Sequence, residues 1–89
     1  MPRYQVKLSK RAFKFLDSLD EKTGRRGIAA LDGLANYGLY DKSLDLCKLK
    51  GQKDYYRLRT GKIRIIFMLT EEAKSILVRK IAYREAAYE

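Results

Sequence analysis

The spacing of apolar side chains changes from that of a strand to that of two helices over the first third of the chain. Residues 3–8 (RYQVKL) alternate between polar and apolar, which is typical of a half-buried strand. Residues 10–19 and 21–35 carry apolar side chains at helical spacing, after the N-cap residues Ser9 and Asp20. Because the link between these two segments is short, we expect a helical hairpin.

The second predicted helix combines an apolar stripe with two glycines. Gly24 and Gly27 each weaken a helix by about 1 kcal/mol relative to alanine. Either the helix begins late, or a close helix–helix crossing uses the missing side chains. The stripe expected to face the core comprises Ile28, Leu31, Leu34 and Ala35.

Four strands are predicted in the second half of the chain, at residues 44–50, 55–59, 63–69 and 75–83. Their connections are short, so consecutive strands should pair antiparallel. We therefore expect residues 1–89 to form a single α+β domain with the order β-α-α-β-β-β-β. Its sheet should be largely antiparallel, with the helical hairpin packed on one face.

Alternation along the middle strands assigns side chains to the two faces of this sheet. The apolar set expected beneath the helices is Ile63, Ile65, Phe67 and Leu69. Arg57, Arg59 and Arg64 should share the opposite face. A two-residue loop at Thr60–Gly61 would make Arg57 and Arg64 direct cross-strand neighbours, whereas a glycine bulge would shift the pairing by one residue. Like charges on neighbouring strands repel, so the cluster indicates a bound anion such as phosphate.

The charge balance supports a polyanionic partner. The 89 residues carry 20 Lys+Arg against 11 Asp+Glu, a net charge of +9, and much of this excess lies between Cys47 and Phe67. A local basic field attracts polyanions and speeds their association. The alternative is a solvated, solubilising surface. Hydrophobic residues make up 46% of the chain, enough for a compact core.

Several classes of site are disfavoured by what the chain lacks. Cys47 is the single cysteine and histidine is absent, so neither an internal disulfide nor a structural zinc site is expected. No cofactor is expected. There is no apolar run long enough to span a membrane and no signal-peptide pattern, so we expect a cytoplasmic protein without a membrane partner.

The order of elements and four motifs resemble the RelE/ParE superfamily of bacterial and archaeal toxins. The motifs are YQVKLSKRAFKFLDSLD at the start, LKG at 49–51, YRLRTGKIRIIF at 56–67, and RKIAYREAAY near the end. The resemblance implies a RelE-like fold and a toxin of a toxin–antitoxin pair, held inactive by an antitoxin peptide wrapped around it. RelE-like members cut messenger RNA in the ribosomal A site, whereas ParE-like members poison DNA gyrase. The LKG and YRLR motifs and the terminal arginine and tyrosine resemble the RelE branch more closely.

The resemblance also implies which residues act in a metal-independent endonuclease, where the 2′-hydroxyl attacks the adjacent phosphate. Tyr83 is a candidate for acid–base chemistry or stacking, although many relatives carry histidine there. Ala82 stands where some RelE enzymes carry a catalytic arginine, so the groups that transfer protons stay open. The implied catalytic residues are Arg57, Arg59, Arg64, Arg84 and Tyr88, and those expected to bind RNA are Lys48, Lys50, Lys53 and Lys62.

Three functions therefore remain open at this point. The first is a ribosome-dependent mRNA endonuclease that inhibits translation, with messenger and ribosomal RNA as partners. The second is a ParE-like gyrase inhibitor, and the third is a weakened or inactive module that only binds an antitoxin. In each case the antitoxin is expected to be acidic or an amphipathic helix, because it must cover a domain of charge +9.

Overall fold

The computed structural model describes residues 3–86 and confirms the predicted α+β class and element order. Each predicted boundary lies within two residues of the observed one. The elements are β1 (Gln5–Leu8), α1 (Lys10–Asp17), α2 (Glu21–Tyr37), the 3₁₀ turn η1 (Gly38–Tyr40), β2 (Asp45–Lys48), β3 (Tyr55–Thr60), β4 (Ile63–Thr70), β5 (Ser75–Tyr83) and the 3₁₀ turn η2 (Arg84–Ala86).

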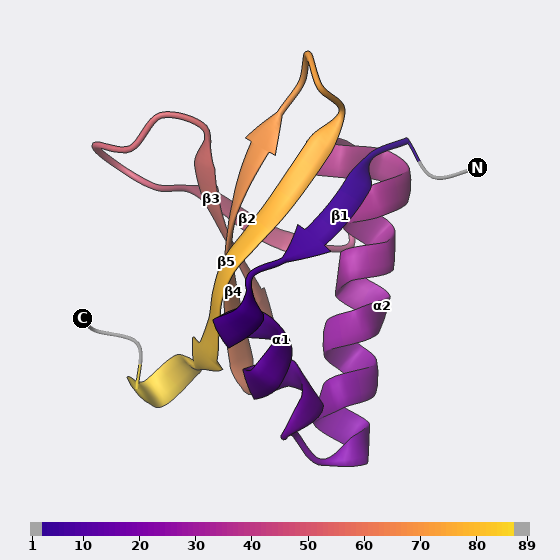
Figure 1. Ribbon diagram of the computed structural model, residues 1–89, viewed down its shortest axis with the longest axis vertical. Coiled ribbons are helices and arrows are strands. Elements are labelled where there is room, and N and C mark those ends of the chain that lie inside the picture. Colours follow the sequence, from indigo (N-terminus) through magenta and orange to yellow (C-terminus); the bar gives the residue numbers. More distant parts are fainter. Residues whose placement is uncertain (1–2, 87–89) are drawn as a thin grey trace.

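The strands form one five-stranded sheet in the order β1-β5-β4-β3-β2. The pairs β2–β3, β3–β4 and β4–β5 are antiparallel, as their short connections predict, and β1 pairs with β5 in parallel. Figure 1 shows α2 running along one face of the sheet, with α1 near one end of the same face. Within residues 3–86 no helix covers the other face, which leaves it open for a partner or substrate.

The side chains beneath the helices form one apolar core. Ile63, Ile65 and Phe67 on β4 are fully buried, and Leu69 is 4% exposed, so the parity prediction for this strand is confirmed. Burying one such side chain contributes about 1.5–3 kcal/mol. The other core residues are Tyr4, Ala12, Ala30, Leu31, Leu34, Leu58, Ile76, Val78 and Ile81.

Both predicted N-caps are present at the starts of the helices. The Ser9 hydroxyl accepts from the backbone N–H of Ala12 at 3.1 Å. The Asp20 carboxylate accepts from the N–H of Thr23, also at 3.1 Å. These bonds satisfy donors that the first turn of a helix leaves unpaired, and α2 therefore begins at Glu21 rather than late.

The two glycines of α2 differ in their surroundings. A Cβ at Gly27 would lie 3.1 Å from Leu16 and 3.3 Å from Ile63, so this glycine allows the close crossing that was one of the two alternatives. Gly24 has no such neighbour. The prediction that Ile28 faces the core is wrong, because the buried stripe follows Gly27, Ala30, Leu31 and Leu34 and leaves Ile28 53% exposed.

The β3–β4 turn has a different register from the two-residue loop at Thr60–Gly61. Thr60 pairs with Ile63, so the loop consists of Gly61 and Lys62. Gly61 has a φ of +57°, and two-residue hairpin loops require positive φ at this first position. Arg59 therefore lies opposite Arg64, and Arg57 lies opposite Ile66. The alternative with a Thr60–Gly61 loop, which would have paired Arg57 with Arg64, is wrong.

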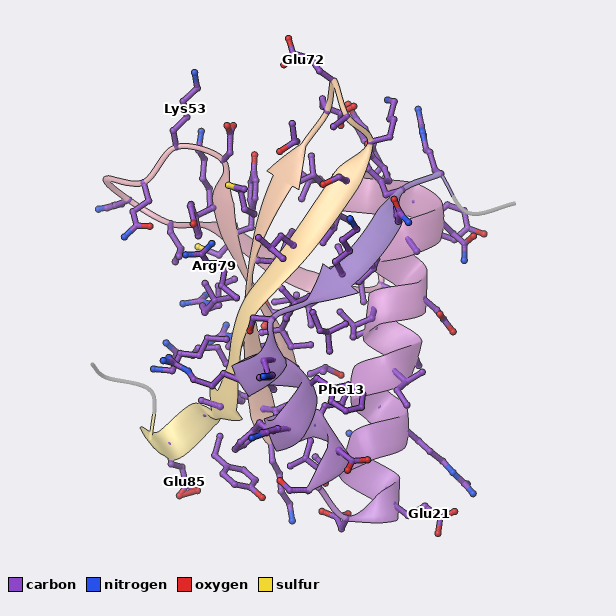
Figure 2. All side chains as sticks on the ribbon, viewed as in Figure 1. Phe13, Glu21, Lys53, Glu72, Arg79 and Glu85 are labelled. Carbon is purple, nitrogen blue, oxygen red and sulfur yellow. The ribbon has the colours of Figure 1, made fainter. Side chains whose placement is uncertain are left out.

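A bulge in β5 changes which of its residues share the open face. The pairing with β4 shifts between Ile66 and Phe67, so that Arg79 becomes an extra residue. Lys80 then lies opposite Ile66, and Ala82 lies opposite Arg64. Figure 2 shows Arg79 on the side of the sheet away from α2, among nitrogen-bearing side chains.

Polar contacts connect the elements at the far end of the sheet. The hydroxyl of Tyr4, whose side chain is buried, donates to the Glu71 carboxylate at 2.5 Å. Lys74 Nζ forms an ion pair with Oε1 of the same carboxylate, at 2.9 Å. The contact between Tyr4 and Glu71 joins the segment before β1 to the β4–β5 turn.

In the described part of the chain, none of the helices has the length and apolar character needed to cross a membrane.

Candidate functional site

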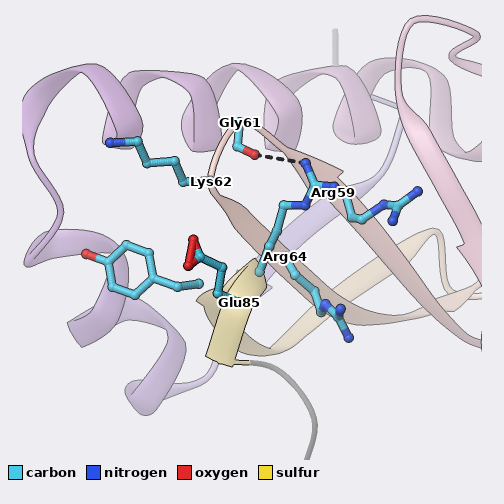
Figure 3. Close-up of a pocket in the computed structure, with 7 residues that line it drawn as sticks. Arg59, Gly61, Lys62, Arg64 and Glu85 are labelled. Atoms are coloured by element: carbon cyan, nitrogen blue, oxygen red, sulfur yellow. Dashed lines mark hydrogen bonds between the residues drawn. The ribbon is translucent and has the colours of Figure 1, made fainter.

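A hollow lies where the β3–β4 turn meets the end of β5. It has a volume of about 1000 Å³, and we call it the arginine hollow. Figure 3 shows the side chains of Arg59 and Arg64 extending toward one side and that of Lys62 toward the opposite side. Its lining residues are Arg59, Gly61, Lys62, Arg64, Tyr83, Arg84 and Glu85.

Arg59 is held by an acidic residue of the neighbouring strand. Its Nε donates to Asp45 Oδ2 at 3.0 Å, and the register places Asp45 directly opposite Arg59. The two side chains are 35% and 52% exposed. Water and salt screen a pair this exposed, so it contributes at most about 1 kcal/mol. Its main effect is to orient Arg59.

The segment after β5 is fastened to the β3–β4 turn. The backbone N–H of Arg84 donates to the Lys62 carbonyl at 2.8 Å. The Arg84 guanidinium donates to the Gly61 carbonyl at 3.2 Å, drawn as the dashed line in Figure 3. These bonds bring a third arginine to the hairpin that carries Arg59 and Arg64.

Tyr83 closes one side of the arginine hollow. Its ring meets that of Phe15 edge to face, with centroids 5.1 Å apart and an interplanar angle of 72°. The side chain is 45% exposed. Tyr83 is therefore anchored on α1 by packing while part of it still lines the hollow.

The remaining predicted site residues lie elsewhere or outside the described residues. Arg57 lies opposite Ile66 on the open face but does not line the arginine hollow, and its buried Nε has no hydrogen-bond partner in the described part of the chain. Lys48, Lys50 and Lys53 surround a separate hollow of about 460 Å³ in the β2–β3 connection. Tyr88 falls outside residues 3–86.

Glu85 and Asp45 belong to this site although sequence reasoning did not single them out. Glu85 follows the predicted Arg84 and adds a carboxylate to a hollow otherwise rich in cations. Its position next to that motif residue was a usable signal. Asp45 had no such signal, because its contact with Arg59 depends on the pairing of β2 with β3.

The arrangement is suited to binding and polarising a phosphate. Arg59, Arg64 and Arg84 supply guanidinium groups, whose paired N–H donors match phosphate oxygens. Glu85 supplies a group that accepts protons and Tyr83 a hydroxyl that donates one. Among residues 3–86 no group of three or more His, Cys, Asp or Glu is placed to hold a metal ion.

Comparison with known proteins identifies the class to which this fold belongs. No family model matches the chain. It is similar to the curated protein "Putative toxin RelE1" of Methanocaldococcus jannaschii, at 29% identity over 97% of this chain and 96% of the relative. The crystal structure of the archaeal RelE–RelB complex from Pyrococcus horikoshii matches at 32% identity, with a TM-score of 0.83, over 96% and 99% of the two chains. The RelB–RelE antitoxin–toxin complex from Methanococcus jannaschii matches at 25% identity, with a TM-score of 0.75, over 91% and 93%.

These similarities extend over nearly the whole chain, and they define a small toxin with a mixed sheet and two helices on one face. The chain belongs to the RelE family of toxins. The predicted resemblance and fold are thereby confirmed.

Proposed function

We propose that this toxin is an endoribonuclease that cuts messenger RNA on the ribosome and so inhibits translation. The observation that carries this proposal is the meeting of Arg59, Arg64 and Arg84 with Glu85 in one hollow. A phosphorane carries more negative charge than the phosphate from which it forms, so fixed cations stabilise the transition state more than the ground state.

The reaction needs no metal in this scheme. The 2′-hydroxyl attacks the adjacent phosphorus in line, the bond to the 5′-oxygen breaks, and a 2′,3′-cyclic phosphate and a 5′-hydroxyl result. Arginine stays protonated and cannot serve as the base. Glu85 accepts the proton of the 2′-hydroxyl, and Tyr83 donates one to the leaving 5′-oxygen. Arg64 binds the scissile phosphate, and Tyr88 contributes to nucleotide binding.

The other basic residues bind RNA outside the reacting centre in this proposal. Lys62 lies in the arginine hollow, whereas Lys48, Lys50 and Lys53 surround the separate hollow in the β2–β3 connection. We assign the latter three to ribosomal RNA and Arg57 to the phosphate next to the scissile one. The toxin then acts in the cytoplasm, in the ribosomal A site, where the ribosome positions the message.

The partner that controls the toxin is proposed to be an antitoxin peptide. Two of the similar structures are complexes of RelE with RelB, and one of them is described as an antitoxin–toxin complex. An acidic or amphipathic helix would complement the charge of +9. By covering the arginine hollow it would keep RNA out.

Induced expression in a bacterial host tests the proposal. Wild-type toxin should arrest growth and leave cleaved messages with an intact chromosome. Arg64→Ala should lower cleavage by about 10²–10³-fold, the usual cost of losing one charge-stabilising donor. The matched control is Arg25→Ala, which removes an exposed arginine of α2 paired with Glu21 and should stay fully toxic. Three outcomes would contradict the proposal: undiminished cleavage by Arg64→Ala, chromosome breaks with intact messages, or no growth arrest.

A further inference from the structure

A second hollow on the open face adjoins the arginine hollow. It has a volume of about 280 Å³, and Arg64 lines both hollows. We call it the tyrosine hollow. This volume is just below the range of about 300–1000 Å³ usual for drug-sized ligands, so it suits a single ring system. Besides Arg64, the lining residues are Leu49, Gln52, Tyr55, Ile66, Lys80 and Ala82.

The sheet register explains why the tyrosine hollow exists. Arg64 and Ile66 lie on the same face of β4, about 6.8 Å apart at the usual rise per residue. On β5, Ala82 lies opposite Arg64 and Lys80 opposite Ile66. Ala82, which is opposite Arg64 and next to Lys80 on the same face, contributes only a methyl group, and this leaves the space open.

Tyr55 supplies an aromatic wall on the other side. It pairs with Met68 on β4 and is therefore diagonal to Ile66, within reach of an aromatic side chain. Its ring has no aromatic partner among residues 3–86, in contrast to Tyr56, which stacks on Phe67 on the helical side of the sheet. Tyr55 is half-buried and so is held in place without being covered.

The polar groups of the tyrosine hollow define the chemistry of its occupant. Gln52 offers an amide that can both donate and accept, which matches the mixed edge of a nucleobase. Arg64 and Lys80 favour an occupant attached to a phosphate. An apolar protein side chain would make no use of the Gln52 amide or of the two cations. A planar base joined to a phosphate uses the aromatic wall, the amide and the cations together.

We infer that the tyrosine hollow binds a nucleobase of the RNA strand whose phosphate is held by Arg64. This inference rests on the proposed RNA substrate and adds to it a base-binding subsite. The base stacks on Tyr55 above Ile66 and Ala82, with its polar edge toward Gln52. The strand then runs from the arginine hollow across Arg64 into the tyrosine hollow.

A short RNA that cannot be cleaved tests the subsite apart from the chemistry. The probe is a trinucleotide with 2′-O-methyl groups and a central 2-aminopurine, whose fluorescence falls when the base stacks. The full chain should quench it, Tyr55→Phe should quench equally, and Tyr55→Ala should weaken binding on the order of 10-fold or more. Tyr40→Ala, which removes a tyrosine that is 77% exposed on η1, is the matched control and should behave as wild type.

A filling substitution and an abasic trinucleotide separate base binding from phosphate binding. Ala82→Leu should weaken the 2-aminopurine probe on the order of 10-fold and leave the abasic probe unchanged, whereas Arg64→Ala should weaken both. Circular dichroism checks that each variant is folded.

Absence of quenching by the wild-type toxin overturns the inference. So does equal binding by Tyr55→Ala, or an Ala82→Leu variant that loses only antitoxin binding. If messages are cleaved in cells while Tyr55→Ala binds normally, the subsite is wrong and the proposed function stands. If Tyr55→Ala loses quenching but no message is cleaved, the subsite stands and the reaction is wrong.

Discussion

Glu85 is the one acidic side chain that lines the arginine hollow within the described part of the chain. If it takes the proton of the 2′-hydroxyl, Glu85→Gln should lower the cleavage rate by about 10²–10⁴-fold, the usual contribution of a general base. Binding of uncleavable RNA should stay the same or become tighter, because a negative charge next to the phosphate is lost. Cleavage of a reporter message on purified ribosomes and anisotropy of a 2′-O-methyl RNA measure the two quantities.

Glu72→Gln is the control for that substitution. Glu72 is exposed in the β4–β5 turn, which Figure 2 shows at the opposite end of the molecule from Glu85. It should cleave at the wild-type rate. Equal loss in both variants, or undiminished cleavage by Glu85→Gln, would remove Glu85 from the reaction.

The sequence predicts on which face of the sheet a side chain lies wherever the alternation along a single strand decides it. Arg59 and Arg64 lie on the open face and Ile65 and Phe67 in the core because side chains alternate along a strand. The contact between Asp45 and Arg59 could not be predicted in this way. It depends on how two strands separated by a loop align, which no local pattern records.

At the scale of elements, the helix starts and the order of elements along the chain were predictable, whereas the turn register and the parallel pairing of β1 with β5 were not. Ser9 and Asp20 mark the starts of α1 and α2 because their side chains accept hydrogen bonds from backbone N–H groups that the first helical turn leaves unpaired. In the β3–β4 turn, one glycine beside two polar residues is compatible with two loops. The choice of Gly61–Lys62 also fits the bond from the Arg84 N–H to the Lys62 carbonyl, a contact from the far end of the chain.

The end of α2 gives a stability prediction. Gly38 has a φ of +59°, and a Cβ there would lie 2.6 Å from the Tyr4 ring. Gly38→Ala should therefore lower the free energy of unfolding by about 1–3 kcal/mol from backbone strain alone. Gly24→Ala is the opposite case, because it has open space in a helix, and should raise that free energy by about 0.5–1 kcal/mol. Urea unfolding of the two variants measures both, and the same sign for both would refute the argument.

At the scale of the whole molecule, the contact between Tyr4 and Glu71 makes stability depend on pH. The hydrogen bond from Tyr4 lowers the pKa of the Glu71 carboxyl below its usual 4.5, with Lys74 acting in the same direction. Its contribution is therefore present above pH 4.5 and is lost as the pH falls through the lowered value. The bond to Glu71, followed by burial, raises the pKa of Tyr4 above its usual 10.0, so that contribution is lost as the pH rises beyond it.

Tyr4→Phe isolates this contact from the other groups that titrate. Asp20 also has a lowered pKa, caused by its hydrogen bonds to Thr23, so wild-type stability falls in acid for more than one reason. The difference in unfolding free energy between wild type and Tyr4→Phe should be largest between about pH 4.5 and pH 10 and should shrink on either side. Urea titrations across pH measure it, and a difference independent of pH would show that only packing was lost.

The charge of +9 predicts how RNA binding responds to salt. Each phosphate neutralised on single-stranded RNA contributes about −0.7 to the slope of log K against log salt. Arg64→Ala and Lys62→Ala should each make this slope shallower by about 0.7, whereas Tyr55→Ala should lower affinity with no change of slope. Anisotropy titrations between about 50 and 200 mM salt measure these slopes. An unchanged slope for Arg64→Ala would mean that it contacts no phosphate.

The parallel pairing of β1 with β5 determines when the sheet can be completed during synthesis of the chain. Gln5 pairs with Ser75, so the partners lie 70 positions apart (75 − 5). At a synthesis rate of about 5–20 residues per second, β5 begins to be made roughly 4–14 s after β1. Until then the sheet is incomplete and Ala82, Tyr83 and Arg84 have not joined the hairpin. If the toxin acts on ribosomes as proposed, the ribosome that makes it should be protected from the chain still attached to it, and a chain stopped before Ser75 should not arrest growth.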